Sequence, residues 1–172
     1  ILANYWQAIG RLRGPVVGTL MSNYALELHC RNQGLPFIRT KVGDRYVLEN
    51  MLANGYKLGG EQSGHIIFSD FSTTGDGLIT GLQVLSSVKR SGKRASALAG
   101  LMTSYPQLLV NVVVKTKDGW EENEAIRAAI EAGNTELGED GRILVRPSGT
   151  EPLIRVMAEG PNQSQLETIC QR

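Results

Sequence analysis

The chain has 172 residues, of which 41% are hydrophobic and 20% are charged, so it is long enough for one large domain or two small domains with buried cores. These values exclude a disordered segment, a collagen-like repeat and a small disulfide-stapled protein. Lys and Arg total 18 and Asp and Glu total 17, and the net charge of +1 gives no electrostatic reason to expect binding to nucleic acid.

The first predicted element is a helix that starts at the beginning of the chain. Apolar residues recur there at helical spacing, at Ile1, Leu2, Tyr5, Trp6, Ile9 and Leu12. No capping residue precedes them, and the apolar stripe of the last predicted helix stops after about two turns. We therefore expect this sequence to be a piece of a longer chain, either truncated within its first domain or starting at a domain junction.

Strands and helices alternate through the first part of the chain. After Gly14-Pro15 the patterns predict strands at 16–20, 37–40, 56–58 and 65–71, and helices from Ser22 or Asn23 to Gly34, at 44–53 and at 77–89. Thr74 or Asp76 is the expected cap of the last of these helices. Such alternation is typical of a doubly wound α/β layer.

The second part of the chain has a different pattern. A basic stretch at 89–94 is a linker candidate that we interpret as a solvated turn, and a short Ala/Leu helix follows it. Strands are then expected at 107–117, 142–146 and 153–159, and helices at 121–132 and from about 162. This order predicts a small α+β domain whose antiparallel sheet carries helices on one face. We place the domain boundary at 104/105, giving domains 1–104 and 105–172.

The two cysteines, Cys30 and Cys170, have neither CxxC nor metal-site spacing. We interpret them as reduced thiols of a cytoplasmic protein. The longest apolar run, 108–114, is far shorter than the roughly 18 residues of a membrane span, and no signal peptide is recognisable. We therefore expect no membrane association.

The first loop with chemical potential is Gly59-Gly60-Glu61-Gln62-Ser63-Gly64-His65, between two short strands. Three glycines allow tight bends while a carboxylate, an amide, a hydroxyl and an imidazole are presented together. Such a set suits the neighbouring hydroxyls of a sugar, and His65 can also move protons near neutral pH. A polar turn with a satisfied strand-edge histidine explains the same residues equally well on spacing alone.

The second loop is Arg146-Pro147-Ser148-Gly149-Thr150-Glu151-Pro152, with Arg155 beyond it. Ser148 and Glu151 match a capping box, which would indicate the start of a helix. The alternation over 154–158 is that of a strand, however, so no helix follows. Hydroxyls, a glycine amide and two guanidinium groups around one turn instead favour an anion site suited to phosphate.

These two loops resemble the sugar-binding and phosphate-binding loops of the α-D-phosphohexomutases. Two further stretches, Lys41-Val42-Gly43-Asp44-Arg45-Tyr46 and Thr73-Thr74-Gly75-Asp76-Gly77, look most like the bacterial branch of that family that acts on glucosamine phosphates. The resemblance covers essentially the whole chain. It implies the third domain of four, a mixed-sheet α/β layer, followed by the small α+β fourth domain.

The resemblance also implies roles for individual residues. Glu61 and Ser63 would bind sugar hydroxyls, with Gln62 and His65 in the same loop. The phosphate that is not reacting would be held by Arg146, Ser148, Gly149, Thr150 and Arg155. His65 and Lys41 match positions near the transferring oxygen and would assist proton transfer, although a solvated lysine at a strand end explains Lys41 equally well.

In this family a phosphoserine and a hexose phosphate form a bisphosphate, which reorients and returns the other phosphoryl group to serine. For this branch the reaction interconverts glucosamine 6-phosphate and glucosamine 1-phosphate, an isomerisation on the route to UDP-N-acetylglucosamine and peptidoglycan precursors. The family's phosphoserine and its aspartate-rich magnesium loop belong to the first two domains, and neither motif occurs in this sequence. We therefore expect no metal ligand here, dependence on the missing domains, and an inactive fragment.

Three alternatives remain open. The sugar specificity can be that of a phosphomannomutase or a phosphoglucomutase. The chain can be a phosphosugar-binding module with no catalysis, or a structural pair of domains whose polar turns bind nothing. The last alternative requires both loops to match the family spacing by coincidence.

Overall fold

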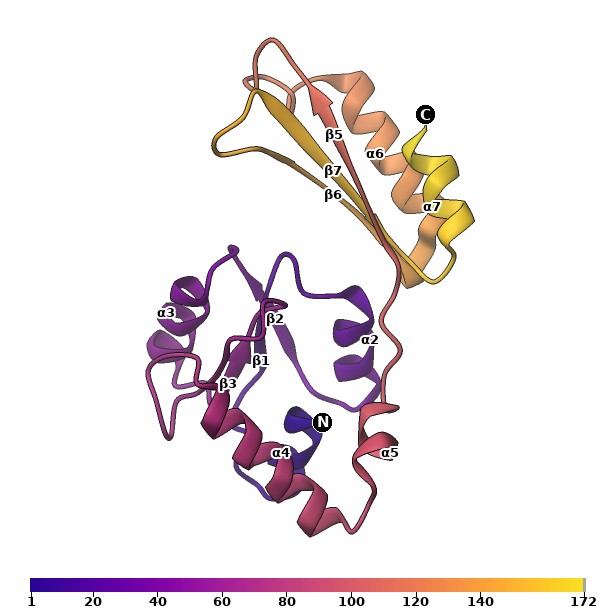
Figure 1. The fold of residues 1–172 in the computed structure, drawn as a ribbon. Coiled ribbons are helices and arrows are strands. Elements are labelled where there is room, and N and C mark those ends of the chain that lie inside the picture. The colour runs from indigo at the N-terminus through magenta and orange to yellow at the C-terminus, as the bar shows by residue number, and fades with distance from the viewer. Residues whose placement is uncertain (172) are drawn as a thin grey trace. The chain divides into compact units, whose positions relative to one another are not determined.

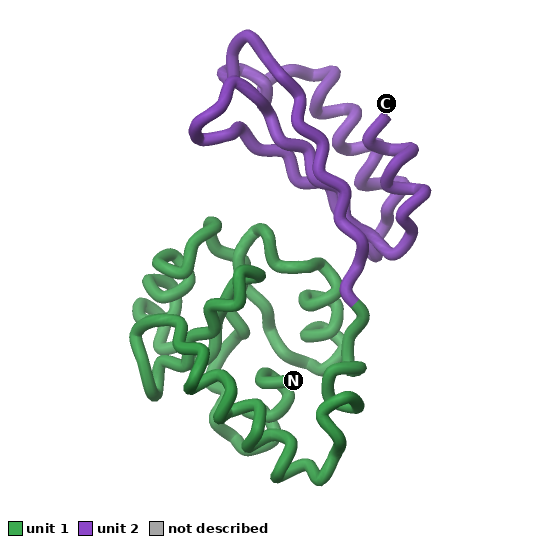
Figure 2. The backbone as a smooth tube through the Cα atoms, viewed as in Figure 1, with its two compact units in different colours: residues 1–103 green, residues 104–172 purple. Residues whose placement is uncertain are grey.

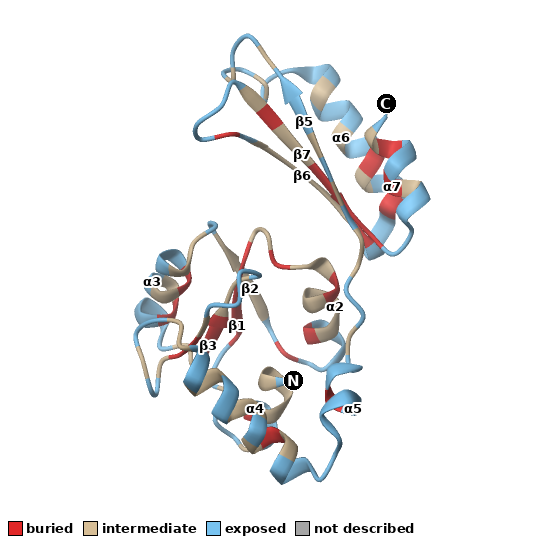
Figure 3. Cartoon of the chain, viewed as in Figure 1, coloured by how far each residue is buried: buried red, intermediate tan, exposed pale blue. Residues whose placement is uncertain are grey.

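The computed structural model of the protein describes residues 1–171. The chain forms two compact units, residues 1–103 and residues 104–172 (Figure 2). Buried hydrophobic residues form separate clusters in the two units (Figure 3). Each unit therefore has its own core.

Unit 1 contains a four-stranded mixed sheet (Figure 1). Its elements are α1 (Leu2–Ala8), β1 (Val16–Thr19), α2 (Tyr24–Asn32), β2 (Phe37–Thr40), α3 (Asp44–Asn54), β3 (Leu58–Gly60), β4 (Ile66–Phe68), α4 (Gly77–Ser91) and α5 (Ala95–Ala99). The strand order is β2-β1-β3-β4, in which β1 pairs in parallel with β2 and β3, and β4 is antiparallel to β3.

Both faces of this sheet are covered by helices. Val16 packs in a cluster with Trp6 of α1 and Cys30 of α2, whereas its neighbour Val17 packs with Val47 and Met51 of α3. Successive residues of a strand point to opposite faces, so α2 and α3 lie on opposite sides of β1. This arrangement confirms the predicted doubly wound α/β layer.

The helix ends of unit 1 follow the local sequence signals. The Asn23 side chain accepts a hydrogen bond from the amide of Ala25 at 3.2 Å and caps α2. Ser22, the other cap candidate, instead accepts a bond from the Thr19 amide. At α4 the Asp76 carboxylate accepts from the Ile79 amide at 2.9 Å, so Asp76 rather than Thr74 is the cap.

Unit 2 contains a three-stranded antiparallel sheet in the order β5-β7-β6. Its elements are β5 (Gln107–Val113), α6 (Glu124–Leu137), a 3-10 turn (Gly138–Asp140), β6 (Arg142–Pro147), β7 (Leu153–Glu159) and α7 (Gln163–Cys170). Leu137 of α6 and Leu166 and Ile169 of α7 pack with Ala158 of β7. Both helices therefore cover the same face, as predicted for the α+β domain (Figure 1).

A buried ionic row crosses the sheet of unit 2. Glu159 is fully buried, and its carboxylate accepts hydrogen bonds from Arg142 Nε at 2.8 Å and from Gln107 Nε2 at 2.6 Å. These three residues are cross-strand partners on β6, β7 and β5. The row ties all three strands together at one end of the sheet.

Several predicted boundaries are wrong. The strand predicted at 56–58 instead covers Leu58–Gly60. The first two glycines of the Gly59–His65 loop, called the sugar-loop motif below, therefore belong to β3. The strand predicted at 65–71 ends at Phe68, where the Phe71 amide bonds the Phe68 carbonyl in a turn. The strand predicted at 107–117 ends at Val113.

The helix predicted at 121–132 begins and ends later, as α6. It begins after Asn123, whose side chain accepts bonds from the Ala125 and Ile126 amides. It continues through Gly133 to Leu137, and a Cβ at position 133 would meet the end of the Ile143 side chain on β6. Close approach to the sheet, rather than a helix end, explains that glycine.

The two cysteines are free thiols. Burial raises the pKa of the Cys30 thiol to about 11, and burial also raises the pKa of Cys170. Both side chains therefore stay protonated near neutral pH. Within residues 1–171, no helix combines the length and the apolar character needed to cross a membrane.

Candidate functional site

The sugar-loop motif lies at one edge of the unit 1 sheet. β2, β1 and β3 are parallel, so the segments after Thr40, Thr19 and Gly60 all leave the sheet at its carboxyl edge. In open α/β sheets this edge is where ligands bind. The edge thus brings together the strand ends that precede Lys41 and Glu61.

Residues 61–65 form a tight connection between β3 and β4. Gly60 pairs with Ile66 across the hairpin, the Glu61 amide donates to the His65 carbonyl at 3.1 Å, and Gly64 has φ +94. A side chain at Gly60 would strike the His65 carbonyl oxygen, 2.7 Å from its Cβ position. Glycine at these two positions is therefore required by the turn and by close backbone contact.

Three side chains of this loop form one hydrogen-bonded chain. Ser63 Oγ donates to Glu61 Oε1 at 2.8 Å and lies 2.8 Å from His65 Nδ1, while His65 Nδ1 and Glu61 Oε1 are 3.6 Å apart. The Glu61 side chain is 13% exposed and that of His65 54% exposed. The carboxylate is thus sheltered while the imidazole faces solvent.

The hydrogen-bond directions fix the tautomer of His65. A carboxylate can only accept, so the single proton of the Ser63 hydroxyl is directed to Glu61. Ser63 Oγ must then accept from His65, and Nδ1 carries the proton in the neutral ring. Nε2 is left as the basic nitrogen, and it makes no hydrogen bond within residues 1–171.

Gly75 supports the other side of His65. A Cβ at position 75 would lie 2.9 Å from His65 Cβ and 3.0 Å from its Cα. The next residue, Asp76, donates its amide to the Ile66 carbonyl, which joins this stretch to β4. Gly75 belongs to the Thr73–Gly77 stretch noted from the sequence, and only this tertiary contact reveals why it has no side chain.

Gln62 and Lys41 are not part of this hydrogen-bonded chain. Both are exposed, and neither side chain forms a hydrogen bond or ion pair within residues 1–171. Lys41 Nζ lies 5.9 Å from the centre of the Tyr46 ring. The structure therefore places both at the sheet edge, with their side chains available to a ligand or to solvent.

The phosphate-loop motif is the turn of the β6–β7 hairpin. Arg146 and Arg155 are direct cross-strand partners. Val145 and Val156, also partners, line the apolar hollow under the helices, so the arginines lie on the opposite, open face of the sheet. Like charges placed directly opposite are unfavourable unless an anion lies between them.

A buried hydroxyl and an exposed turn lie beside this arginine pair. The Ser148 side chain is buried, and its Oγ accepts from the Glu151 amide at 3.3 Å and from Arg155 Nη2 at 3.4 Å. Gly149 and Thr150 are exposed at the tip of the turn. The expected strand after the loop is confirmed as β7, which excludes the helix that a capping box would have indicated.

Two residues near this loop were not singled out from the sequence. Lys117 Nζ donates to the Ser148 carbonyl at 2.7 Å, which adds a third cationic side chain. Asn111 is the cross-strand partner of Arg155 on β5 and therefore shares its open face. Neither could be found from local patterns because both depend on how β5 pairs with β7.

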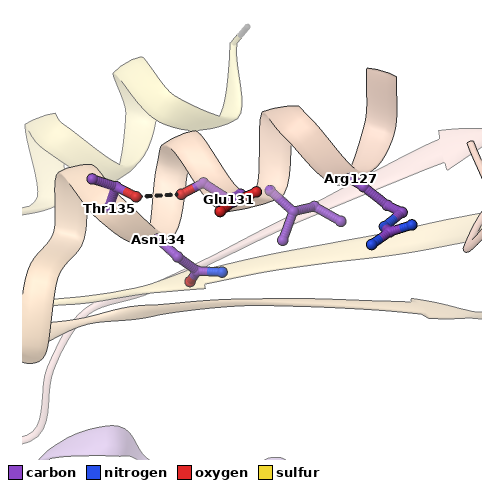
Figure 4. Close-up of a pocket in the computed structure, with 5 residues that line it drawn as sticks. Arg127, Glu131, Asn134 and Thr135 are labelled. Carbon is purple, nitrogen blue, oxygen red and sulfur yellow. Dashed lines mark hydrogen bonds between the residues drawn. The ribbon is translucent and has the colours of Figure 1, made fainter. Parts of the chain in front are cut away.

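A separate groove along α6 has a lining of different character. Arg127, Ile130, Glu131, Asn134 and Thr135 line it, all from one helix (Figure 4). The Thr135 hydroxyl donates to the backbone carbonyl of Glu131, and Asn134 accepts the Ile143 amide. These polar groups serve the helix and its contact with the sheet, so we do not regard the groove as the functional site.

Comparisons with known proteins agree with the geometry of both units. Residues 1–105 match the family described as phosphoglucomutase/phosphomannomutase, alpha/beta/alpha domain III, and residues 109–172 match its C-terminal domain. Curated relatives named phosphoglucosamine mutase include those of Clostridium novyi (56% identical over 93% of this chain), Alkaliphilus metalliredigens (53% over 91%) and Geobacillus thermodenitrificans (51% over 100%). The matched regions span 36% to 39% of the length of these relatives.

Solved structures show the same fold. An N-acetylglucosamine-phosphate mutase in its substrate complex matches 98% of this chain and 41% of its own, with a TM-score of 0.74 at 23% identity. The N-acetylphosphoglucosamine mutase of Aspergillus fumigatus, in complex with GlcNAc-6P and magnesium, matches 99% of this chain and 43% of its own, with a TM-score of 0.74 at 22% identity. At these identities the likeness establishes the fold.

Proposed function

This chain belongs to the phosphoglucomutase/phosphomannomutase family, and from that membership we propose that it is the part of a phosphoglucosamine mutase that binds the sugar and the non-reacting phosphate. The observation that carries the proposal is the Arg146–Arg155 pair, which faces across the hairpin beside the Ser148–Thr150 turn. Guanidinium groups match the geometry of phosphate oxygens and can bind them in pairs. The substrate class is a hexosamine phosphate, in keeping with relatives that are 51% to 56% identical.

The residues of unit 1 have two proposed roles. Glu61, Ser63 and Gln62 orient sugar hydroxyls. His65 uses Nε2 to accept the proton of the hydroxyl that attacks the transferring phosphoryl group, and returns it in the reverse direction. Lys41 is proposed as a second polar group at the same sheet edge. Because phosphoryl transfer depends mainly on positioning and electrostatics, residues that position the substrate contribute directly to the rate.

The remaining parts of the reaction are proposed to lie in domains of the complete cytoplasmic enzyme that this chain does not contain. Residues 1–171 hold no group of three or more His, Cys, Asp or Glu side chains placed to bind a metal ion. In keeping with the family resemblance, we propose that the magnesium ion and the phosphoserine lie in those other domains. No step proposed for the residues of this chain involves the metal ion.

A coupled assay of the complete enzyme tests the specificity. Glucosamine 6-phosphate, mannose 6-phosphate and glucose 6-phosphate are compared under identical conditions, and the highest kcat/KM is expected for the glucosamine compound. A preference for mannose or glucose would replace the proposed specificity with that of the corresponding mutase. Calorimetry of this chain with glucosamine 6-phosphate tests the alternative of a phosphosugar-binding module with no catalysis. Tight binding without the other domains would favour that alternative.

Substituting Ser63 by alanine is expected to lower kcat/KM about 2- to 12-fold, the equivalent of one hydrogen bond worth about 0.5–1.5 kcal/mol. The same substitution removes the acceptor that holds the proton on His65 Nδ1, so the neutral ring shifts toward the Nε2–H form. Nitrogen NMR of the imidazoles measures this shift in the 172-residue chain.

His29 serves as an internal reference for the NMR measurement on His65. The chain has two histidines, and His29 Nε2 is bonded to Asn4 at 3.1 Å, away from Ser63. The His29 tautomer should not change. Unchanged kinetics would contradict the sugar-binding role of Ser63, and an unchanged His65 tautomer would contradict the hydrogen-bond directions assigned above.

A further inference from the structure

Three cationic side chains lie at the phosphate loop. Arg146 and Arg155 face each other on the open side of the sheet, and Lys117 Nζ lies 2.7 Å from the Ser148 carbonyl oxygen. Cations this close repel one another unless a negative group is placed among them. In the absence of a substrate, a carboxylate of the protein can take that place.

Glu151 supplies it from within the loop. Its Oε2 lies 3.0 Å from Arg155 Nη2 and 3.5 Å from Ser148 Oγ. These are the guanidinium and the hydroxyl that the proposed function assigns to the phosphate. The Glu151 carboxylate therefore uses the same two donors that a phosphate oxygen would use.

The pair is built so that it can open. The Arg155 side chain is 30% exposed and that of Glu151 is 54% exposed, and ion pairs this exposed add little stability. Arg155 Nε is buried and has no hydrogen-bond partner within residues 1–171, so the guanidinium is incompletely satisfied by the carboxylate. A phosphate can satisfy a guanidinium edge with two oxygens at once, which a single Glu151 oxygen cannot do.

We propose that Glu151 is a tethered competitor of the substrate phosphate: its carboxylate holds Arg155 when the site is empty and releases it when phosphate binds. This inference rests on the proposed function of the loop. In a reaction whose bisphosphate must reorient between two phosphoryl transfers, the phosphate group bound in the loop has to leave it as readily as it enters. Glu151 provides a replacement partner for Arg155 at that moment, and so limits how tightly the phosphate is held.

The test is a titration of the 172-residue chain with inorganic phosphate. The NMR shifts of the Gly149 and Thr150 amides report the binding. Glu151→Gln keeps the shape of the side chain and removes its charge, and it is expected to tighten phosphate binding about 3- to 10-fold. Glu139→Gln is the matched control. It makes the same charge change at the opposite end of β6, about 20 Å away, and should leave the affinity unchanged.

The Glu151→Gln substitution in an Arg155→Gln variant shows whether Glu151 acts on phosphate binding through Arg155. In an Arg155→Gln chain the carboxylate has lost its partner, so adding Glu151→Gln should change phosphate affinity less than twofold. If the full tightening persists there, Glu151 acts by general repulsion and the inference is wrong. If Glu151→Gln leaves affinity unchanged or weakens it in the original chain, the inference also fails, while the phosphate site stands. If neither chain binds phosphate, the site itself and the inference fail together.

Discussion

Replacing Arg146 by alanine in the complete enzyme is expected to raise KM for the hexosamine phosphate roughly 10- to 150-fold, with a smaller change in kcat. The estimate corresponds to losing charge-assisted hydrogen bonds worth about 1.5–3 kcal/mol. In the proposed function Arg146 holds the phosphate that does not react, so its contribution is expected to be similar in the ground state and the transition state. Arg155 remains, but a single guanidinium provides only half of the pair that faces across the hairpin.

Steady-state kinetics with glucosamine 6-phosphate measure this effect. Arg127→Ala is the control, because Arg127 is an exposed arginine of the same unit that lies on α6 and lines a groove without phosphate-loop residues. Its KM should stay within about twofold of the original. An unchanged KM for Arg146→Ala would remove the main support for the phosphate assignment.

Replacing Glu159 by alanine is expected to lower the free energy of unfolding of unit 2 by about 3–5 kcal/mol. The substitution leaves the Arg142 guanidinium, only 16% exposed, without its 2.8 Å partner and removes the acceptor of Gln107. Keeping the largely buried Arg142 charge without this carboxylate is the costly outcome, more so than the loss of the attraction itself. Because all three strands meet in this row, the whole sheet should lose stability.

Urea unfolding of a fluorotryptophan-labelled chain measures each unit separately by fluorine NMR. The chain has two tryptophans, Trp6 in unit 1 and Trp120 in unit 2. The midpoint reported by Trp120 should fall while that of Trp6 stays in place. Glu167→Ala, an exposed glutamate on α7, should change stability by less than about 0.5 kcal/mol. A similarly small effect of Glu159→Ala would show that the buried row is dispensable.

Local sequence signals were sufficient for much of the fold. Asn23 before the helical pattern and Gly34 after it marked the two ends of α2. The strand alternation over 154–158 showed that the second loop leads into a strand rather than into a helix. These signals work because capping, turn formation and strand alternation involve neighbouring residues. Gly133 shows where such reasoning fails, since a glycine that permits contact with Ile143 has the same local appearance as one that ends a helix.

The sequence was sufficient to predict which loops form the candidate site, but not how their side chains are arranged. The sequence indicates that Glu61, Ser63 and His65 are close, yet the direction of each hydrogen bond, and with it the basic nitrogen of His65, depends on the conformation of the turn. The position of Arg146 opposite Arg155 likewise depends on strand register, which spacing alone does not give. Lys117 and Gly75 act through contacts between distant segments.

The separate cores of the two units have an evolutionary consequence. Each unit buries its own hydrophobic cluster, so a destabilising substitution around Met51 acts on the core of unit 1 and one around Leu166 acts on the core of unit 2. Selection can therefore alter the Glu61–His65 loop of unit 1 while the β6–β7 hairpin of unit 2 is preserved. If the proposed roles hold, such independence would let the sugar preference change without any change in the loop proposed to bind the phosphate.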